Sequence, residues 1–530
     1  MEDTGGLSVL LFRETQFCSN ARVDRFPIRG LYIPGGVGQF PTREFGDGSE
    51  KYVERGHKRR PPKHIPLLGS KPKRGRLVSD LEGLDRQMLA KGVGRAQRLS
   101  RLVDEIMDYK TVDRSTAEKL ALAVLDEVEA SSNAVKRDET GILSFPRCGV
   151  TVGEQGVGCR GTGDFVAHRI VAELSQTGTR VALAPTDMDD AGATVLPDGR
   201  FLVAKMEGMH SRLSDFPFLA GFHVARAAMR DVYVKGAVPL GLLVDIHLGD
   251  DADVGKLFDF TAGVSAVCDL AGCPILGGST LRIGGDMVIG PRMTGGVAVF
   301  GLAERLFPRA NVRAGDIIVM TEGSGGGTIC TTAIYSARPE VIQETLNVKF
   351  LTSAKTLLTS SVVSEISCLA DVTNGGIRAD LYEIGEQAGC GAEVQRDAIE
   401  SMINPRVRDL LEDTGVDPLG VSLDSLLIFC RPGAEGQILE ELAKVRVKAS
   451  IIGRVKQGRA VEIVGKDGRS ELLPRFRESA YTPLKKVVES AGTPPTDFES
   501  SLRRCAEQAQ RRKRAVVKAI REGRPVYLRE

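Results

Sequence analysis

The sequence contains no tryptophan, and aromatic residues make up only 5% of its 530 residues. Proteins that bind single-stranded nucleic acid usually stack bases on aromatic side chains, so a nucleic-acid partner is not expected. No apolar run approaches the roughly 18–20 residues of a membrane-spanning helix. The first residues, MEDTGG, lack the basic segment of a secretory signal. We therefore expect a cytoplasmic protein that does not contact a membrane.

Cysteine and histidine spacings typical of metal sites are also absent. The ten cysteines are scattered singly, without a CxxC pair, and in a reducing compartment such residues act as small buried hydrophobic side chains. The formal net charge of +2 conceals two basic segments, at 58–76 and 503–524. Runs of this kind are more often solvated tails than binding sites.

The length of the chain exceeds what one hydrophobic core usually organises, so several domains are expected. The residue patterns predict five parts, of α+β and α/β class. They are an irregular, disordered segment at 1–76, a helical module at 77–145, mixed domains at 150–305 and 308–460, and a linker with a basic helical tail at 485–530. Within the helical module, Ser115 is the expected N-cap of the third helix.

An ordered series of short motifs carries the functional signal. The series is GVGCRGTGD (156–164), TDMDDAGA (186–193), KMEGMHS (205–211), RDVYVKGAVP (230–239), GGST (277–280) and ADVTNGGIRADLYEIG (370–385). Each motif is weak alone, because glycine runs make turns and aspartates often cap helices. Together they alternate backbone loops that can cradle phosphates with acidic clusters that can hold Mg²⁺. Their order therefore predicts an ATP-using site.

The acidic residues of these motifs are candidate metal ligands. Asp189 and Asp190 are adjacent, and carboxylates this close raise each other's pKa unless a cation offsets them. Glu207 follows a predicted strand, and Asp231 lies inside or at the end of a long helix. The plain alternatives are an exposed acidic turn for the aspartate pair and a surface Arg–Asp pair for Asp231.

Two glycine-rich segments are candidate phosphate-binding loops. The first does not open a Rossmann unit, because no hydrophobic strand ends directly before it. We interpret it as a mobile segment that could close over phosphates. The second follows a predicted short strand, CPIL, as a turn whose amides could approach an anion. The candidates are Gly156, Gly158, Gly161 and Gly163 in the first segment and Gly277, Gly278, Ser279 and Thr280 in the second.

Three further residues are candidate catalytic groups. Cys159 and Arg160 occupy the middle of the first glycine-rich segment. An adjacent arginine favours a thiolate only modestly, and most single cysteines are structural. Asp371 precedes a Gly-Gly turn that opens a helix, whose free N–H groups could face a substrate anion. An ordinary capped helix start explains that pattern equally well.

At these motifs the chain resembles the AIR synthase-like superfamily. This group includes aminoimidazole ribonucleotide synthetase, FGAM synthase, selenophosphate synthetase, thiamine-monophosphate kinase and a hydrogenase maturation factor. DMDDAGATVLPDGRFLV is similar to the family's Asp-Asp-Ala loop, and KMEGMHS and RDVYVKGAVPLG are similar to the next two motifs in FGAM synthase and thiamine-phosphate kinase. The resemblance covers about 150–460, and the layout is most similar to uncharacterised archaeal AIR synthase-related proteins.

The resemblance implies a fold, a cofactor and an oligomeric state. An N-terminal α+β domain would pair its sheet with that of a second subunit, which makes a homodimer, and a C-terminal α/β domain would pack against it. ATP would bind in the cleft, with Asp189, Asp190 and Asp231 holding Mg²⁺ and residues 156–164 covering the phosphates.

The chain also departs from the family pattern. Ser279 stands where the family has an acidic residue or histidine. The chain ends VYLRE, whereas the hydrogenase maturation factors end in a reactive cysteine. Selenophosphate synthetases carry a lysine beside the cysteine of their glycine-rich loop, where this chain has Arg160.

These observations lead to one principal functional hypothesis and two alternatives. The first is an ATP- and Mg²⁺-dependent phosphotransferase or synthetase that acts on a small metabolite. The second is a nucleotide-binding accessory or assembly protein without turnover, and the third is a selenophosphate synthetase-like enzyme. The sequence does not identify the acceptor substrate.

Overall fold

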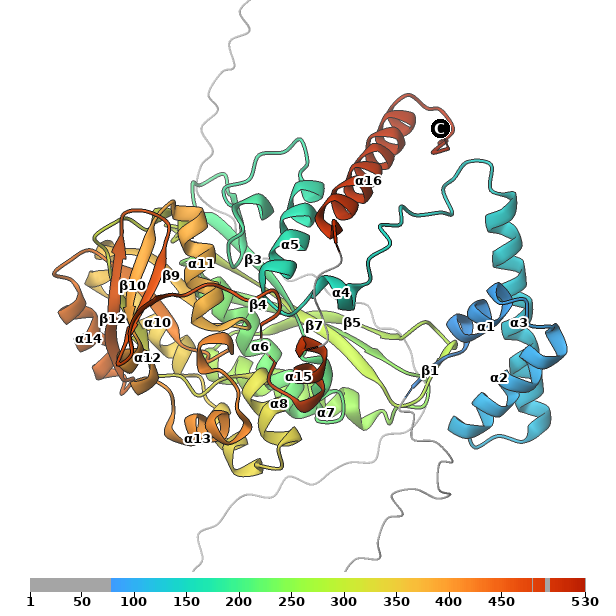
Figure 1. The fold of residues 1–530 in the computed structure, drawn as a ribbon, viewed down its shortest axis with the longest axis horizontal. Helices are drawn as coiled ribbons and strands as arrows, with labels where there is room; N and C mark the ends of the chain where they lie inside the picture. The colour runs from blue at the N-terminus through green and yellow to red at the C-terminus, as the bar shows by residue number, and fades with distance from the viewer. Residues whose placement is uncertain (1–77, 479, 491–495, 530) are drawn as a thin grey trace, which may run out of the picture. The chain divides into compact units, whose positions relative to one another are not determined.

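The computed structural model of the chain describes residues 78–478, 480–490 and 496–529, which belong to one compact unit (Figure 1). The predictions for residues 1–76, including the basic run at 58–76, lie outside the described residues. The described residues form an α/β structure built on two mixed sheets, which confirms the expected fold class. Among them, every helix is too short or too polar to cross a bilayer.

The first described segment is a helical module. It comprises β1 (Ser79–Asp80), α1 (Leu81–Ala90), α2 (Arg95–Tyr109) and α3 (Arg114–Arg137). The expected N-cap of the third helix is wrong: Asp113, not Ser115, caps α3 and accepts a hydrogen bond of 2.8 Å from the Thr116 amide. Aspartate and serine are comparable caps, so the sequence alone could not choose between positions two residues apart.

The helical module is joined to the rest of the unit by a strand pair. β1 pairs antiparallel with β6 (Val288–Ile289), and the buried Ile289 belongs to the same hydrophobic cluster as Leu102 and Leu125 of the helices. Lys110 adds an ion pair of 2.8 Å to Asp251. The module therefore docks on the strand-connecting loops of the first main sheet.

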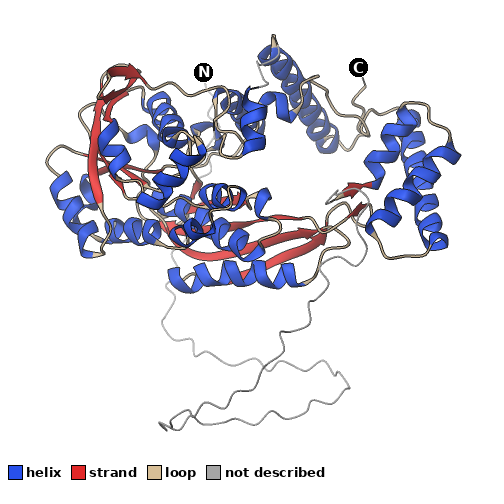
Figure 2. Cartoon of the chain, turned by 60° about the horizontal axis from the view of Figure 1, so that its bottom comes forward, coloured by secondary structure: helices blue, strands red, loops and turns tan. Residues whose placement is uncertain are grey.

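The first main sheet has five strands and is covered by helices on one face (Figure 2). Its strand order is β2 (Gly192–Val195), β3 (Phe201–Gly208), β7 (Met293–Ala303), β4 (Val238–Leu248) and β5 (Ile275–Arg282). Only the β4–β5 pair is parallel; the other three are antiparallel. The covering helices are α6 (Pro217–Val234) and α7 (Gly255–Ala271). The opposite face carries exposed apolar side chains, among them Met206, Leu240 and Leu276.

The second main sheet has seven strands. Its order is β14 (Gly468–Glu471), β13 (Val461–Gly465), β10 (Gly391–Gln395), β12 (Ala449–Lys456), β8 (Ile317–Thr321), β11 (Leu426–Cys430) and β9 (Ile366–Asp371). The helices of this region are α8 (Gly327–Tyr335), α9 (Ile342–Thr345), α10 (Lys349–Thr359), α11 (Gly376–Ala388), α12 (Arg396–Ser401), α13 (Pro405–Thr414) and α14 (Glu435–Lys444). Strand β11 is buried along its whole length, as expected for a strand with covered faces.

Helix α6 lies at the centre of the unit. From Ala220 to Val234 nearly every residue is buried, and its apolar side chains share one core cluster with residues of both sheets, such as Val299 and Leu369. A helix that is buried all round must also bury its charged residues. Arg230 and Asp231 are accordingly buried, so the surface-pair interpretation of this dipeptide is wrong.

The remaining elements connect the start and the end of the described chain. They are α4 (Val152–Gln155), α5 (Thr162–Ser175), α15 (Pro483–Ser490) and α16 (Phe498–Arg521). The basic terminal helix is present as α16. Its Lys513 donates hydrogen bonds of 2.9 and 2.6 Å to the carbonyls of Leu174 and Gln176 at the C-terminus of α5, a favourable place for a cation. At least one of its basic residues thus has an intramolecular partner.

Candidate functional site

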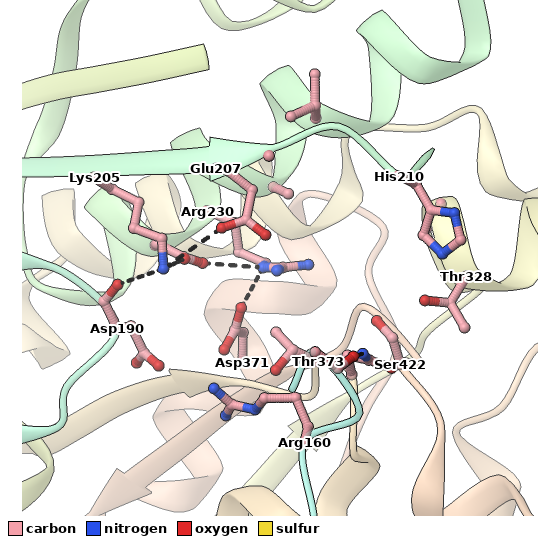
Figure 3. Close-up of a pocket in the computed structure, with 18 of the residues that line it drawn as sticks. Arg160, Asp190, Lys205, Glu207, His210, Arg230, Thr328, Asp371, Thr373 and Ser422 are labelled. Atoms are coloured by element: carbon pink, nitrogen blue, oxygen red, sulfur yellow. Dashed lines mark hydrogen bonds and ion pairs between the residues drawn. The ribbon is translucent and has the colours of Figure 1, made fainter. Parts of the chain in front are cut away.

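A cavity of about 850 Å³ lies among the predicted motifs. Strands of both main sheets contribute side chains to its lining, among them Lys205 and Asp371 (Figure 3). The segment after the second sheet contributes Tyr481 and Lys485. The charged and polar lining includes Arg160, Asp189, Asp190, Lys205, Glu207, His210, Arg212, Arg230, Asp231, Arg309, Asp371, Tyr481 and Lys485, and Gly158 also lines the cavity. The structure thus gathers residues more than 300 positions apart into one site.

The aspartate pair is held by buried cations. Lys235, which is fully buried, lies 2.6 Å from Asp189 and 3.1 Å from Asp190. Arg309 lies 2.5 Å from Asp190 and donates its backbone N–H to Asp189. Burial opposes ionisation, but Arg309, Lys235 and Lys205 together hold the pKa of Asp190 well below its usual range. Asp190 is therefore ionised, and both carboxylates are buried beside cations, so the pair is not an exposed acidic turn.

A second lysine lies among the other predicted ligands. The Lys205 ammonium is 2.7 Å from Asp231, 3.6 Å from Glu207 and 2.9 Å from the Asp190 carbonyl. Figure 3 shows Lys205 and Glu207 facing the same space beside Asp190. The Glu207 carboxylate is 36% exposed. It has no closer charged partner among the residues that the structure describes.

These contacts test whether the predicted ligands fit Mg²⁺. The described residues contain no group of three or more histidine, cysteine or acidic side chains placed to hold a metal ion. However, Mg²⁺ is usually held by one or two carboxylates together with substrate phosphates. Glu207 and Asp231 fit that requirement, because the partner of Asp231 is Lys205, which is partly exposed and lines the cavity, whereas Asp189 and Asp190 are engaged by the buried Lys235 and Arg309. The Mg²⁺ assignment of the four residues stays a prediction.

Asp371 ends strand β9 and contacts Arg230 of helix α6. Arg230 also lies 2.6 Å from Asp424, which in turn pairs at 2.8 Å with Arg226. All four side chains are buried. Asp371 therefore links the second sheet to α6 at the cavity wall, and the helix-start interpretation of its motif accounts for only part of its role.

Arg160 connects the glycine-rich segment to helix α11. Its guanidinium lies 2.6 Å from Glu383 and 3.5 Å from Asp380. Burial, opposed by Arg160 and Arg309 and reinforced by Glu383 and Asp190, raises the pKa of Asp380 to about 7. Asp380 also accepts the Thr373 amide at 3.1 Å. Near neutral pH, this carboxyl is therefore poised between its charged and neutral forms.

The raised pKa of Asp380 predicts a pH-dependent stability. Between about pH 4 and pH 7 the folded protein holds a proton on Asp380 that the unfolded chain has released, so this contribution falls as pH rises. The expected slope is up to about 1.4 kcal/mol per pH unit from this group. Asp380→Asn should remove that contribution in urea unfolding measured at pH 5, 6 and 7. Glu386→Gln, on the exposed face of the same helix, should keep the wild-type slope; an unchanged slope in Asp380→Asn contradicts the assignment.

The glycine-rich segment is held in place by a later part of the chain. The amides of Thr162 and Gly163 donate to the carbonyls of Arg475 and Phe476 at 2.9 and 3.2 Å. We call residues 474–478 and 480–482 the C-terminal strap. A Cβ atom on Gly161 would lie 2.4 Å from two strap carbonyls, so this glycine permits close backbone approach.

The expectation of a mobile phosphate loop is therefore corrected. Gly156 and Gly163 pack against Arg477 and Phe476 of the C-terminal strap, and among the candidates of this segment only Gly158 and Arg160 line the cavity. The segment begins at Gly156, the C-cap of α4, forms a turn and enters the first turn of α5. Asp164 was not among the predicted site residues. Its carboxylate is buried and accepts hydrogen bonds from the backbone amides of Gly158 and Arg160 at 3.1 and 2.9 Å.

Cys159 is not arranged as an activated nucleophile. Burial raises the pKa of its thiol, and the positive charge of Lys485 offsets this only in part. Its backbone carbonyl accepts the Glu478 amide at 3.2 Å. A protonated, half-buried thiol is a poor nucleophile. The catalytic assignment of Cys159 stays a prediction, and the selenophosphate synthetase-like alternative, which needs a reactive group here, receives no support from it.

The GGST segment lies elsewhere. It does not form a turn after a short strand; it continues the edge strand β5, parallel to β4. A Cβ atom on Gly278 would lie 2.2 Å from the Val244 carbonyl, so this glycine serves the close strand pairing. Gly277, Gly278, Ser279 and Thr280 are exposed and are not among the lining residues of the cavity. Their assignment to nucleotide binding stays a prediction that a single chain does not support.

The far end of the cavity is built around His210. Its ring nitrogens lie 2.6 Å from the Tyr481 hydroxyl and 3.1 Å from the Thr331 hydroxyl. Burial, together with the charges of Lys485 and Arg212, lowers the pKa of His210 to about 4, so the imidazole is neutral at physiological pH. Figure 3 shows His210 and Thr328 away from Asp190 and Lys205.

Motif reading missed most of the cationic groups of the site. Lys235, Arg309 and Lys485 were not singled out, because lysine and arginine are normally surface residues. The sequence does contain one indication that Lys235 is buried, because this residue directly follows the apolar helix of the RDVYVKGAVP motif. Arg309 and Lys485 carry none, because only the tertiary fold brings them to the cavity.

Comparison with known proteins places these features in a family. The N-terminal domain model of AIR synthase related proteins matches residues 188–303, and the C-terminal domain model matches residues 313–466. An uncharacterised protein of Methanocaldococcus jannaschii is 43% identical over 460 residues, which is 85% of this chain and all of the relative.

Relatives with named activities are more distant. Selenide, water dikinase of Myxococcus xanthus is 30% identical, covering 46% of this chain and 68% of the relative, and thiamine-monophosphate kinase of Pyrococcus horikoshii is 24% identical, covering 54% and 88%. Among solved structures, hydrogenase maturation protein HypE in complex with ATP matches at 18% identity and a TM-score of 0.44, covering 65% of this chain and 94% of that one.

Proposed function

Because the chain belongs to the AIR synthase related family, we propose that it binds ATP in this cavity and uses it to phosphorylate or activate a small metabolite. The observation that carries the proposal is the convergence of both family domains on one charged cavity of about 850 Å³. Two of the relatives are kinases by name. This volume is within the usual range of small-molecule sites, about 300–1,000 Å³.

The cavity residues suit catalysis by positioning. Lys205 and Arg160 both direct a positive charge into the cavity. Lys205 lies on strand β3, and Arg160 lies in a turn whose backbone amide is hydrogen-bonded to Asp164. Their buried carboxylate partners Asp231 and Glu383 fix their side chains. Phosphoryl transfer needs such preorganised charge more than covalent chemistry by the protein. These cations would bind and orient the phosphates of the nucleotide.

Glu207 and Asp231 are the residues that would hold Mg²⁺ brought in with the nucleotide. When bound, the ion would supply positive charge to the phosphate oxygens and so favour transfer. Asp231 is fixed by Lys205, whereas Glu207 is the more exposed of the two. Glu207 is therefore the carboxylate that can turn toward a ligand without leaving a buried cation unpaired.

Isothermal titration with a non-hydrolysable ATP analogue tests the proposal. We expect binding that is at least about tenfold tighter with Mg²⁺, the equivalent of one 1.4 kcal/mol interaction. Glu207→Gln should reduce this Mg²⁺ effect, because the amide has lost the charge. Asp198→Asn, in the exposed turn before the same strand, is the matched control and should titrate like the wild type. Absence of binding in both conditions would refute the proposal.

A second candidate function is nucleotide binding without turnover, by an accessory or assembly protein. It is favoured by one observation: the carboxylates of Asp189 and Asp190 are already engaged by Lys235 and Arg309. Analogue binding without ATP hydrolysis in the presence of candidate metabolites, together with a co-purifying protein, would support this candidate.

We also propose a homodimer that forms through the uncovered face of the five-stranded sheet. Met206, Leu240, Leu276 and Leu281 of β3, β4 and β5 are 48–58% exposed. Apolar patches of this kind mark protein interfaces in soluble proteins. The exposed GGST segment of β5 belongs to the same sheet, so a second chain would approach it directly.

A further inference from the structure

The charges of the cavity are distributed unevenly. At one end, Lys205, Arg230 and Arg309 each have a carboxylate oxygen within 3.3 Å of a side-chain nitrogen. At the His210 end, Arg212 and Lys485 also line the cavity. Within residues 78–478, 480–490 and 496–529, neither side chain has a hydrogen bond or a carboxylate within ion-pair distance.

These two cations are held in place by aromatic rings. The Arg212 guanidinium lies 4.1 Å from the centroid of Tyr335, and the Lys485 ammonium lies 4.3 Å from that of Tyr481. A cation over an aromatic face is stabilised without being neutralised. Tyr481 is itself fixed by its hydrogen bond to His210. The arrangement presents fixed, uncompensated positive charge to the cavity.

The neighbouring titratable groups do not cancel this charge. His210 is neutral, and burial raises the pKa of the Tyr481 hydroxyl, so neither carries a negative charge near neutral pH. Burial, with repulsion from Arg212, outweighs the opposing effect of Cys159 and lowers the pKa of Lys485, and burial keeps the Cys159 thiol itself protonated. This shift shows that the ammonium would gain from a bound anion, because a negative partner restores the preference for its charged form.

We propose that Arg212 and Lys485, with the His210–Tyr481 pair, form the binding site for an oxyanion group, a carboxylate or phosphate, of the acceptor substrate. Its identification as an acceptor site rests on the proposed function, but the anion site itself does not. The opposite end of the cavity, with Lys205 and Arg160, is left for the nucleotide. The same cavity of about 850 Å³ is lined by residues of both ends.

The proposed anion site depends on residues outside the matched family domains. Tyr481 and Lys485 lie beyond residue 466, where the match to the C-terminal family domain ends. They enter the cavity because the C-terminal strap is bound to the glycine-rich segment through Thr162 and Gly163. The anion site is therefore built by a segment outside the shared domains, on a scaffold that the shared domains provide.

Binding of inorganic phosphate and of malonate to the full-length protein tests the site. Each anion is titrated against the thermal unfolding midpoint and by calorimetry, with and without a saturating non-hydrolysable ATP analogue. We expect both anions to bind in either condition, and Arg212→Gln and Lys485→Gln each to weaken binding about tenfold, since a charge-assisted contact contributes about 1.5–3 kcal/mol. Analogue affinity should stay within about threefold, which also shows that the variants are folded.

Lys486→Gln is the matched control. Lys486 is adjacent to Lys485, but its ammonium is directed to the carbonyls of Thr414 and Gly415 and not to the cavity, so anion binding should be unchanged. The inference is overturned if neither anion binds, if both variants bind them like the wild type, or if the ATP analogue displaces them, which would make this the nucleotide phosphate site. Anion binding in a protein that binds no nucleotide would keep the anion site while refuting the proposed function.

Discussion

Replacing Lys235 by methionine is expected to lower the free energy of unfolding by about 3–5 kcal/mol, the range for removing one partner of a buried ion pair. Lys235 is fully buried and its ammonium contacts Asp189, Asp190 and the carbonyls of Phe307 and Leu369. Methionine fills a similar volume, so the loss is of charge and hydrogen bonds and not of packing. Two adjacent buried carboxylates would then depend on Arg309, with only the weaker charge interaction of Lys205 with Asp190 beside it.

Chemical denaturation with guanidinium or urea measures the effect. Lys349→Met is the control: the Lys349 ammonium forms a single pair of 2.8 Å with Glu322, and its side chain is 45% exposed. An exposed pair contributes about 0–1 kcal/mol, so this variant should unfold nearly like the wild type. If both variants lower the free energy of unfolding by the same small amount, the buried charge cluster around Asp189 and Asp190 does not stabilise the fold.

Substituting Gly161 by alanine is expected to separate the C-terminal strap from the glycine-rich segment. The new methyl group would lie 2.4 Å from the carbonyl oxygens of both Arg475 and Phe476, and two backbone carbonyls cannot move aside without breaking the hydrogen bonds of Thr162 and Gly163. Overpacking of this kind costs about 1–3 kcal/mol. Because the same strap carries Tyr481, we also expect weaker phosphate binding at the far end of the cavity.

Unfolding curves and phosphate titrations of the same samples separate the two effects. Gly153→Ala is the matched control, because Gly153 lies in helix α4 of the same region and a Cβ atom there would contact nothing within 4 Å. Alanine is the better helix former by about 1 kcal/mol, so this variant should be as stable as the wild type or slightly more so. Wild-type stability in Gly161→Ala would show that the strap is not tightly bound.

The role of a glycine could not be read from the sequence, even where its position was singled out. Gly158 lines the cavity, Gly161 receives the C-terminal strap and Gly278 serves strand pairing. All three belong to motifs for which the local sequence predicts turns. What differs is the backbone that approaches each glycine from elsewhere in the chain, and the segments that approach Gly158 and Gly161 lie more than 200 residues away.

Local order was nevertheless determined by the sequence. The helical spacing of apolar residues predicted the helical module, and the residue pattern also predicted the strand before Glu207 and the long helix at Asp231, because hydrophobic periodicity acts over a few residues. The order of the acidic and glycine-rich motifs was sufficient to recognise the family. The local elements and the order of the motifs both depend on short-range patterns, so a single sequence is enough to predict them.

Only the tertiary structure decided which charges meet. Asp189 and Asp190 were predicted as metal ligands, yet Lys235 and Arg309 reach them from 45 or more residues away, and Lys485 enters the cavity from beyond the family domains. Ion pairing depends on distances of a few ångströms and on burial, which strengthens every charge interaction. Neither these distances nor burial can be obtained from the spacing of residues along the chain. The local sequence therefore determined which motifs are present, and the tertiary fold determined which charged groups they contact.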